Sequence, residues 1–299
     1  MKSHRKALYL LMCAFFIAAT ATAPFAQTGK CAFKTLNLPP PANNSTPVAL
    51  NDSGAILGTF IDSKDVSHGF LLFQGRLTPF KFPGSSDSSA IDMSRNGIII
   101  GRYFKDGIGH PFMVHAGGFH EITLPGFPNA EVIVTGVNSN GDIVGNFSVD
   151  NGDTLPGFLL HNGKVTILSF PGATGGTAPA SINDAGVVVG AYFINSVNSN
   201  PAFMWKDGVF SNIKPPDSLP TPFVNVARIS NSGVVVGSYQ AEDGVHGFAL
   251  ENGTYTKIDV PGFSNPLILA VNKFDNILIQ ATQQVGKPVL FKGFCAAAF

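Results

Sequence analysis

The chain has 299 residues, of which 44% are hydrophobic and 13% charged, and its 19 basic and 19 acidic residues cancel. The lack of a basic excess argues against nucleic acid or an anionic membrane surface as a partner. The 33 glycines, 21 prolines and 11% aromatic residues exclude a disordered chain and favour strands joined by turns.

Residues 1–26 have the pattern of a secretory signal peptide, with three basic residues, an apolar segment at 7–19 and small residues up to Ala26. The alternative is an uncleaved membrane anchor, but the apolar segment is shorter than the roughly 20 residues that span a bilayer. We therefore expect residues 27–299 to be a single domain, secreted or periplasmic, monomeric and without a membrane span after cleavage.

One sequence motif recurs along the chain: an apolar pair, Asn or a related residue, a Gly turn, and an aliphatic run that usually ends in Gly. The turn glycines of the first five copies are 43 to 47 residues apart, at positions 54, 97, 141, 186 and 233. In a sixth, degraded copy at 271–280, Asp275-Asn276 replaces the Gly turn. A period in the forties with several strands per unit is typical of a β-propeller.

Each unit is predicted to hold four antiparallel strands. In the fourth unit a short first strand ends at Ile182, a tight turn follows, and the second strand runs over 187–192. The third strand corresponds to 69–73 in the first unit, and the fourth strand ends before a Pro-Gly pair. A polar residue two positions before that proline, such as Lys81, predicts an outer edge strand.

The sixth unit lacks a convincing fourth strand, and the missing strand is found near the N-terminus, where Phe33, Leu36 and Leu38 precede Pro39. We therefore predict an all-β, six-bladed propeller with four-stranded antiparallel blades, the last one closed by the N-terminal strand. This closure would bring Cys31 and Cys295 together, and in an exported chain it predicts a disulfide. The alternative is two free thiols.

The tight turns between first and second strands and between third and fourth strands must share one face. The other two kinds of connection form a loop-rich face, which we predict to bind the ligand because variable loops on a rigid scaffold usually carry function. The polar candidates on that face are Asp62, Asp65, His68, Asp106, His110, Asp150, Asp153, Glu242, Asp243 and His246. Their spacing singles out no catalytic pair, and the plain alternative is that they are solvated loop charges.

His68, His110 and His246 occupy one repeat position, two residues before the phenylalanine of the third strand. Three imidazoles could ligate a metal, but equivalent positions in different blades are spread around a ring. We therefore predict structural histidines that bond loop carbonyls, with no metal and no cofactor.

The triplets His68-Gly69-Phe70, His110-Pro111-Phe112 and His246-Gly247-Phe248, each downstream of an Asn-type Gly turn, make nearly the whole mature chain resemble the HAF-type extracellular repeat proteins of bacteria. The middle residue is Gly or Pro rather than Ala, and three units lack the histidine. The resemblance implies an exported repeat protein without an established activity, and it supplies no catalytic residues.

The sequence thus favours a binding or scaffold module for an extracellular carbohydrate, peptide or partner protein. One alternative is a hydrolase or lyase that acts on polysaccharide through loop carboxylates, and another is a purely structural surface protein. The enzyme would require acids, His or Tyr converging at the axial mouth in a cavity of ligand size, whereas an apolar mouth would favour binding.

Overall fold

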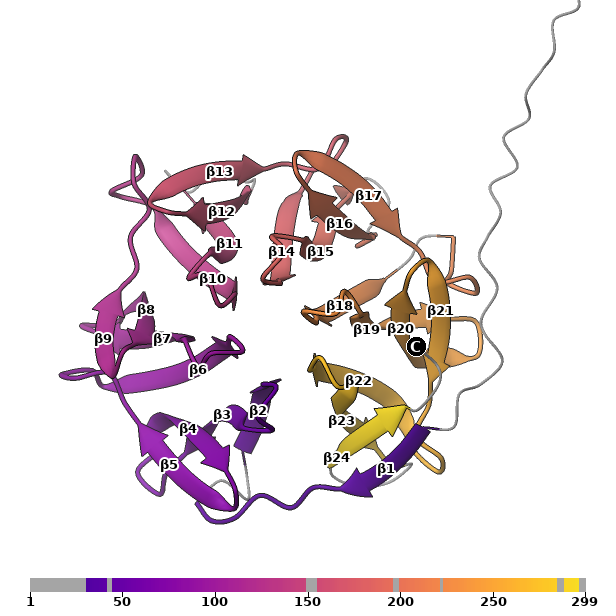
Figure 1. Ribbon diagram of the computed structural model, residues 1–299. Coiled ribbons are helices and arrows are strands. Elements are labelled where there is room, and N and C mark those ends of the chain that lie inside the picture. The colour runs from indigo at the N-terminus through magenta and orange to yellow at the C-terminus, as the bar shows by residue number, and fades with distance from the viewer. Residues whose placement is uncertain are drawn as a thin grey trace, which may run out of the picture.

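The computed structural model describes residues 31–41, 45–148, 155–195, 199–220, 223–283 and 288–295. These residues form six four-stranded antiparallel sheets arranged as blades around a central axis (Figure 1). The predicted six-bladed β-propeller is therefore confirmed. The predicted signal peptide lies outside the described residues, among which no helix is long and apolar enough to cross a bilayer.

Blades 1 to 5 each use four consecutive strands, with the first strand innermost and the fourth outermost. Blade 1 comprises β2 (Ser45–Leu50), β3 (Ile56–Ile61), β4 (Ser67–Phe73) and β5 (Arg76–Phe80). Blade 2 comprises β6 (Asp87–Met93), β7 (Ile99–Lys105), β8 (Ile108–His115) and β9 (Gly118–Glu121). Blade 3 comprises β10 (Glu131–Val137), β11 (Ile143–Ser148), β12 (Gly157–His161) and β13 (Lys164–Leu168).

Blade 4 comprises β14 (Gly176–Ile182), β15 (Val188–Phe193), β16 (Ala202–Lys206) and β17 (Val209–Ile213). Blade 5 comprises β18 (Val224–Ile229), β19 (Val235–Ala241), β20 (Gly244–Glu251) and β21 (Thr254–Ile258). Blade 6 comprises β22 (Ser264–Val271), β23 (Asn276–Thr282), β24 (Pro288–Cys295) and, as its outer strand, β1 (Cys31–Thr35).

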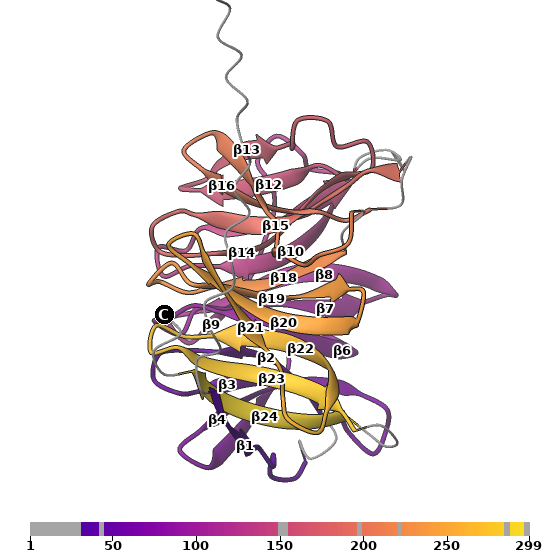
Figure 2. The same ribbon diagram turned by 90° about the vertical axis from the view of Figure 1, so that its right-hand side faces the viewer.

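Blade 6 closes the ring as predicted, with the strand order β1-β24-β23-β22 (Figure 2). The register places Cys31 opposite Cys295 and Thr35 opposite Phe291, and the N–H of Leu36 extends the pairing to the carbonyl of Leu290 at 2.9 Å. Cys31 is disulfide-bonded. The backbone register is the one that a Cys31–Cys295 bridge requires, and that pairing remains our prediction.

In blades 1, 2 and 5 the glycine that ends the aliphatic run of the repeat makes room for a phenylalanine. In blade 1, Gly58 of β3 lies opposite Phe70 of β4, and a Cβ atom at Gly58 would collide with the ring of Phe70. Five fully buried phenylalanines share this position, Phe70, Phe112, Phe158, Phe203 and Phe248. Interior packing leaves no space for added atoms, so the Gly–Phe pair explains why the repeat carries this glycine.

Where the turn between the first and second strands of a blade has an Asn, its side chain bonds both within the turn and to the next blade. Asn183 accepts the N–H groups of Ala185 and Val187 through Oδ1, at 3.1 and 3.0 Å, which holds the turn between β14 and β15. Its Nδ2 donates to the carbonyl of Ser230 in blade 5 at 3.3 Å. Because a serine cannot reach that far, the turns of blades 2 and 5, which have Ser94 and Ser230 here, use the side chain only to hold the turn.

Three details differ from the sequence prediction. The innermost strands are longer than expected: β14 begins at Gly176, and its buried polar residues Thr177 and Ser181 interrupt the apolar pattern of the sequence. Lys81 lies just after β5 rather than in it, where the chain leaves the sheet for the next blade. The connections between second and third strands are not all long: two-residue hairpin turns join β7 to β8 and β19 to β20.

Candidate functional site

The innermost strands carry a β-bulge at the same level in every blade. The ladder to the second strand skips one residue there, which is Val48, Ile91, Thr135, Ala180, Ala227 or Leu269. The residue that follows the bulge is Ala49, Asp92, Gly136, Ser181, Arg228 or Ala270. Only blades 2 and 5 have a charged residue at this level, and these two blades face each other across the ring (Figure 1). A bulge redirects a side chain, so the two charges can meet.

Arg228 closes the axial channel. Its Nη1 donates to the carbonyls of Ala227 and Ala180, at 2.9 and 3.5 Å. Its Nη2 donates to the carbonyls of Ile91 and Val48, at 3.1 and 3.2 Å. All four acceptors are skipped bulge residues, from blades 5, 4, 2 and 1. One guanidinium therefore ties four of the six blades together at the axis.

Asp92 is the counterion of Arg228, with its Oδ1 lying 3.2 Å from Nε. The other oxygen, Oδ2, accepts the N–H of Val137 in blade 3 at 3.1 Å. The two charged side chains are only 7% and 17% exposed. Burial raises the pKa of Asp92, while the charge of Arg228 and two backbone N–H groups oppose that rise. Removing either partner would leave a buried charge uncompensated, which is strongly destabilising.

On the loop-rich side of Arg228 the channel widens into a cavity of about 870 Å³, which we call the vestibule. Its walls come from the beginnings of the innermost strands and from the neighbouring hairpins, and they include Pro47, Ile91, Ala178, Phe223, Val226 and Leu267. Among the described residues that line it, Arg228 is the only charged one. Both the volume and the apolar walls are typical of ligand-binding cavities.

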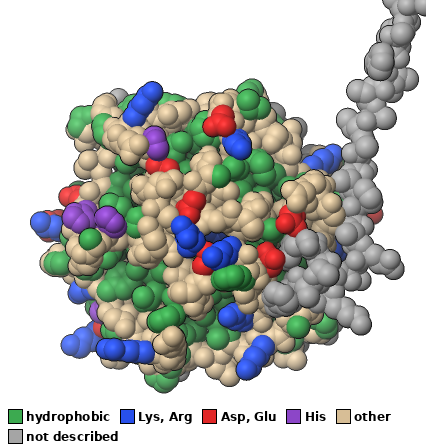
Figure 3. All heavy atoms as spheres, viewed as in Figure 1, with side chains coloured by type: hydrophobic (Ala, Val, Ile, Leu, Met, Phe, Trp, Pro, Cys, Tyr) green, Lys and Arg blue, Asp and Glu red, His purple; other side chains and the backbone are tan. Residues whose placement is uncertain are grey.

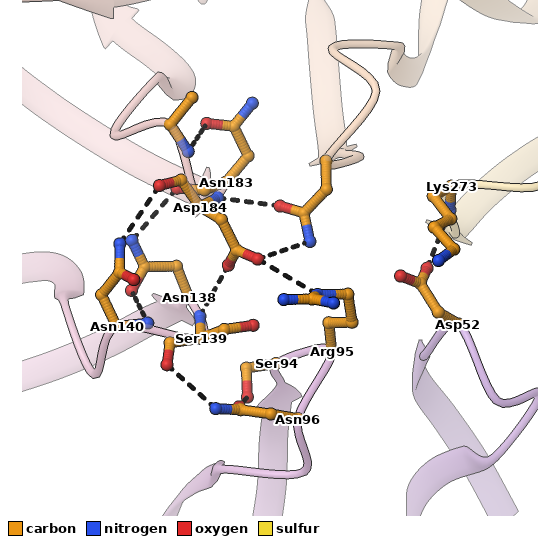
Figure 4. A network of polar contacts seen from close by, with 12 residues as sticks. Asp52, Ser94, Arg95, Asn96, Asn138, Ser139, Asn140, Asn183, Asp184 and Lys273 are labelled. Carbon is orange, nitrogen blue, oxygen red and sulfur yellow. Dashed lines mark hydrogen bonds and ion pairs between the residues drawn. The ribbon is translucent and has the colours of Figure 1, made fainter.

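The opposite mouth of the channel is small and polar. A cavity of about 60 Å³ lies between the turns of the innermost hairpins, again with Arg228 in its lining. Asp184 of blade 4 bonds three other blades here: its carboxylate accepts hydrogen bonds from the N–H of Ser139 at 2.7 Å, Nδ2 of Asn231 at 2.9 Å and Nε of Arg95 at 3.2 Å (Figure 4). In Figure 3, acidic and basic side chains gather over the middle of the ring. Hydrogen bonds between blades thus fill this mouth.

The three repeated histidines pair with carboxylates rather than with loop carbonyls, so that detail of the prediction is wrong. Nε2 of His68 lies 2.9 Å from Asp62, and Nδ1 of His110 lies 3.2 Å from Glu121. His246 bonds Asp259 through Nδ1 at 2.8 Å and a second carboxylate, that of Asp243, through Nε2 at 2.9 Å. A carboxylate accepts a hydrogen bond more strongly than a neutral carbonyl does.

Each of these histidines also packs against an aromatic residue opposite it on the second strand. The rings of Phe60 and His68 stack at 5.2 Å, and those of Tyr103 and His110 at 5.0 Å. The hydrogen bond from His68 lowers the pKa of Asp62 to about 2, with help from the backbone N–H groups of Val66 and Lys64. The repeated histidine therefore anchors the hairpin at the outer part of its blade.

The structure does not gather the sequence-predicted ligand residues into one site. The described candidates belong to hairpins of blades 1, 2 and 5, and none of them lines the vestibule. They are Asp62, Asp65, His68, Asp106, His110, Glu242, Asp243 and His246. Asp150 and Asp153 lie outside the described residues. Within the described part of the chain, no group of three or more His, Cys, Asp or Glu could hold a metal ion.

Asp92 and Arg228 were not among the site residues predicted from the sequence. Their signal was present, because an otherwise small, uncharged repeat position carries opposite charges three repeats apart, and residues three repeats apart in a six-membered ring face each other. The vestibule walls gave no such signal, because alanine, valine and proline at these positions look like ordinary strand residues.

The fold and the axial cavity define the class of this protein as a six-bladed β-propeller with a closed channel. The chain matches no family model and no curated protein sequence. Among solved structures it is similar to the β-propeller domain of the Trilobed protease from Pyrococcus furiosus, with a TM-score of 0.57, 13% identity, and coverage of 83% of this chain and 81% of that one. That domain is described as having an open velcro topology, whereas β1 completes the last blade here.

A fucose-specific lectin from Aleuria aurantia is also similar, with a TM-score of 0.50, 13% identity, and coverage of 87% of this chain and 93% of the lectin. An acylaminoacyl peptidase matches with a TM-score of 0.54 and 12% identity over 84% of this chain, which spans only 44% of the peptidase. At these identities the similarity shows the shared propeller fold alone.

Proposed function

We propose that this protein is an exported binding module whose ligand enters the vestibule from the loop-rich face. The observation that carries the proposal is the vestibule itself, an axial cavity of about 870 Å³ with mainly uncharged walls and a closed floor. Export rests on the signal-peptide pattern and on the resemblance to HAF-type repeat proteins.

The walls favour an uncharged, largely apolar peptide segment of a partner protein. The guanidinium of Arg228 already donates to four carbonyls and faces Asp92, so it offers little to an anionic ligand. Near the mouth, Thr46 and Asn225 are exposed, and their side chains make no hydrogen bond to other described residues. Such groups can bond the N–H and C=O groups of a peptide, while the apolar walls bury its side chains.

Hydrolysis or elimination in the vestibule is disfavoured. General acid–base catalysis requires a titratable group within reach of the scissile bond, and glycoside hydrolysis usually uses two carboxylates. The described lining of the vestibule contains no Asp, Glu, His or Lys, and its one tyrosine, Tyr239, has a pKa raised by burial. These features support binding rather than catalysis.

Titration with Nile red, an uncharged apolar dye, tests the site. We expect saturable binding, and we expect Ala178→Trp, which fills the vestibule wall, to weaken it at least tenfold. Ala185→Trp is the matched control, because Ala185 lies in the turn at the opposite end of the same hairpin. Uncharged heptapeptides selected from a phage library on the purified protein should displace the dye. Equal dye binding by both variants and the wild type would refute the vestibule as the ligand site.

A further inference from the structure

A second cavity, separate from the vestibule, lies on the loop-rich face where blade 2 meets blade 3. Its volume is about 650 Å³, within the usual range for ligand sites. We call it the blade 2–3 cleft; it lies between the β7–β8 hairpin and the connection from β9 to β10. Its lining includes Arg102, Ile108, His110, Glu121, Asn129 and Glu131.

Arg102 breaks the repeat pattern. In blades 1, 3 and 5 the residue after the buried glycine of the second strand is short and bonds to the innermost strand of the next blade. Thr59 accepts the N–H of Ala90, Asn146 donates to the carbonyl of Thr177, and Ser238 donates to the carbonyl of Pro266. In blade 2 this position holds a long cation, whose Nη2 reaches the exposed side chain of Glu131, at the start of the innermost strand of blade 3, at 3.5 Å.

A second departure in blade 2 accommodates the first. The residue before the repeated histidine is Ser67 in blade 1 and Val245 in blade 5, but it is Gly109 in blade 2. A Cβ atom at Gly109 would collide with the guanidinium of Arg102. Arg102 and Gly109, both of which differ from the residues at the same positions of blades 1 and 5, therefore place a guanidinium over the β7–β8 hairpin.

The guanidinium makes two contacts within the fold: it lies 5.0 Å from the centre of the Phe104 ring, and it pairs with Glu131. The ion pair with Glu131 is long and its carboxylate is 65% exposed, and an exposed pair of this kind contributes at most about 1 kcal/mol. The Nε of Arg102 is buried and has no hydrogen-bond partner among the described residues. A buried donor without an acceptor is unfavourable, so the placement of Arg102 costs the fold some free energy.

We propose that the blade 2–3 cleft binds a neutral saccharide. Arg102 supplies planar, paired donors, Glu121 and Glu131 supply paired acceptors, and adjacent hydroxyl groups of a sugar can bond both kinds of group. Ile108, 62% exposed at the hairpin, offers an apolar surface for the C–H face of a sugar ring. The two carboxylates disfavour a phosphate or sulfate, so the ligand is uncharged.

The test uses an array of immobilised neutral oligosaccharides with sulfated and uronic acid glycans beside them. We expect the wild type to bind at least one neutral glycan, and Arg102→Ala to lose that binding at least tenfold. Lys105→Ala is the matched control, since Lys105 carries the same charge on the same strand but lies outside the cleft lining; its binding should stay within twofold. Glu131→Gln should also weaken binding, and comparable melting temperatures would show that the variants fold.

Binding of charged glycans only, binding of no glycan, or equal binding by Arg102→Ala and the wild type would each overturn the proposal. Ala178→Trp separates this site from the vestibule, because it should leave saccharide binding intact while it abolishes Nile red binding. If Ala178→Trp abolishes saccharide binding instead, the sugar lies in the vestibule and the cleft proposal is wrong.

Discussion

The two mouths of the axial channel share one floor, Arg228, but differ in everything else. On the turn side, side chains that bond between blades leave a cavity of only about 60 Å³. On the loop side, the vestibule is a cavity of about 870 Å³ between apolar walls. The same six innermost strands supply both mouths. Because the turn motif is repeated and the connections vary, one end of each innermost strand stabilises the ring, while the other end is free to differ between blades.

The largest expected effect on stability comes from opening the ring of blades, on which both mouths of the channel depend. Reduction of the predicted Cys31–Cys295 bridge should lower the melting temperature by several degrees, because the chain-entropy model gives about 5 kcal/mol for so long a loop. The far-ultraviolet circular dichroism before melting should not change. Thermal melts with and without dithiothreitol measure the effect, and identical melting temperatures would show that the bridge is absent or irrelevant.

The next largest effect is expected at the Asp92–Arg228 ion pair, which forms the floor shared by the two mouths. Asp92→Ala should lower the free energy of unfolding by about 3–5 kcal/mol, because the guanidinium of Arg228 then stays buried without its counterion. The double variant Asp92→Ala/Arg228→Met should lose less, since it buries no charge. Urea unfolding monitored by fluorescence compares the two. A single variant less than 1 kcal/mol below the wild type would mean that the pair is not needed at the floor.

A pair of asparagines tests the contrast between the mouths directly. Asn183→Ala on the turn side removes two accepted hydrogen bonds and one donated to blade 5, which should cost about 2 kcal/mol. Asn225→Ala, exposed at the vestibule mouth, should change stability by less than about 0.5 kcal/mol while weakening ligand binding. Chemical denaturation of both variants provides the measurement, and equal losses would remove the distinction.

The smallest effect lies far from both mouths, in the β3–β4 hairpin. The pKa of Asp62 is lowered from 3.8 to about 2, first by His68. A depressed folded-state pKa stabilises the fold above the unfolded value, and this contribution disappears as the pH falls from about 4 to about 2. Carboxyl chemical shifts in an NMR titration should show the low pKa, and His68→Gln should raise it. An unchanged value in that variant would contradict the role of His68.

Most of the architecture could be predicted from the sequence because each repeat specifies its own blade. The Gly turn, the buried Gly–Phe pair and the closing proline are local features, and the unit without a fourth strand pointed to β1. The lengths of the innermost strands could not be predicted in the same way, because polar residues within them, such as Thr177 and Ser181 of β14, interrupt the apolar pattern on which the prediction relied.

The candidate sites were harder to predict because they depend on contacts between repeats. Arg228 bonds the backbone of blades 1, 2 and 4, and only the closed ring brings those carbonyls around one guanidinium. The polar loop residues chosen from the sequence instead form pairs within their own blades, as His68 does with Asp62. A comparison of equivalent positions across all six repeats would have singled out Arg102, Asp92 and Arg228.

The pairing of β1 with β24 sets the order of assembly. The ribosome makes β1 before β24, with more than 250 residues between them, so β1 stays unpaired until β24 has emerged. Contacts between such distant segments form slowly. Blades 1 to 5 can form from consecutive strands as they appear, whereas the sixth blade is complete only when β1 meets β24.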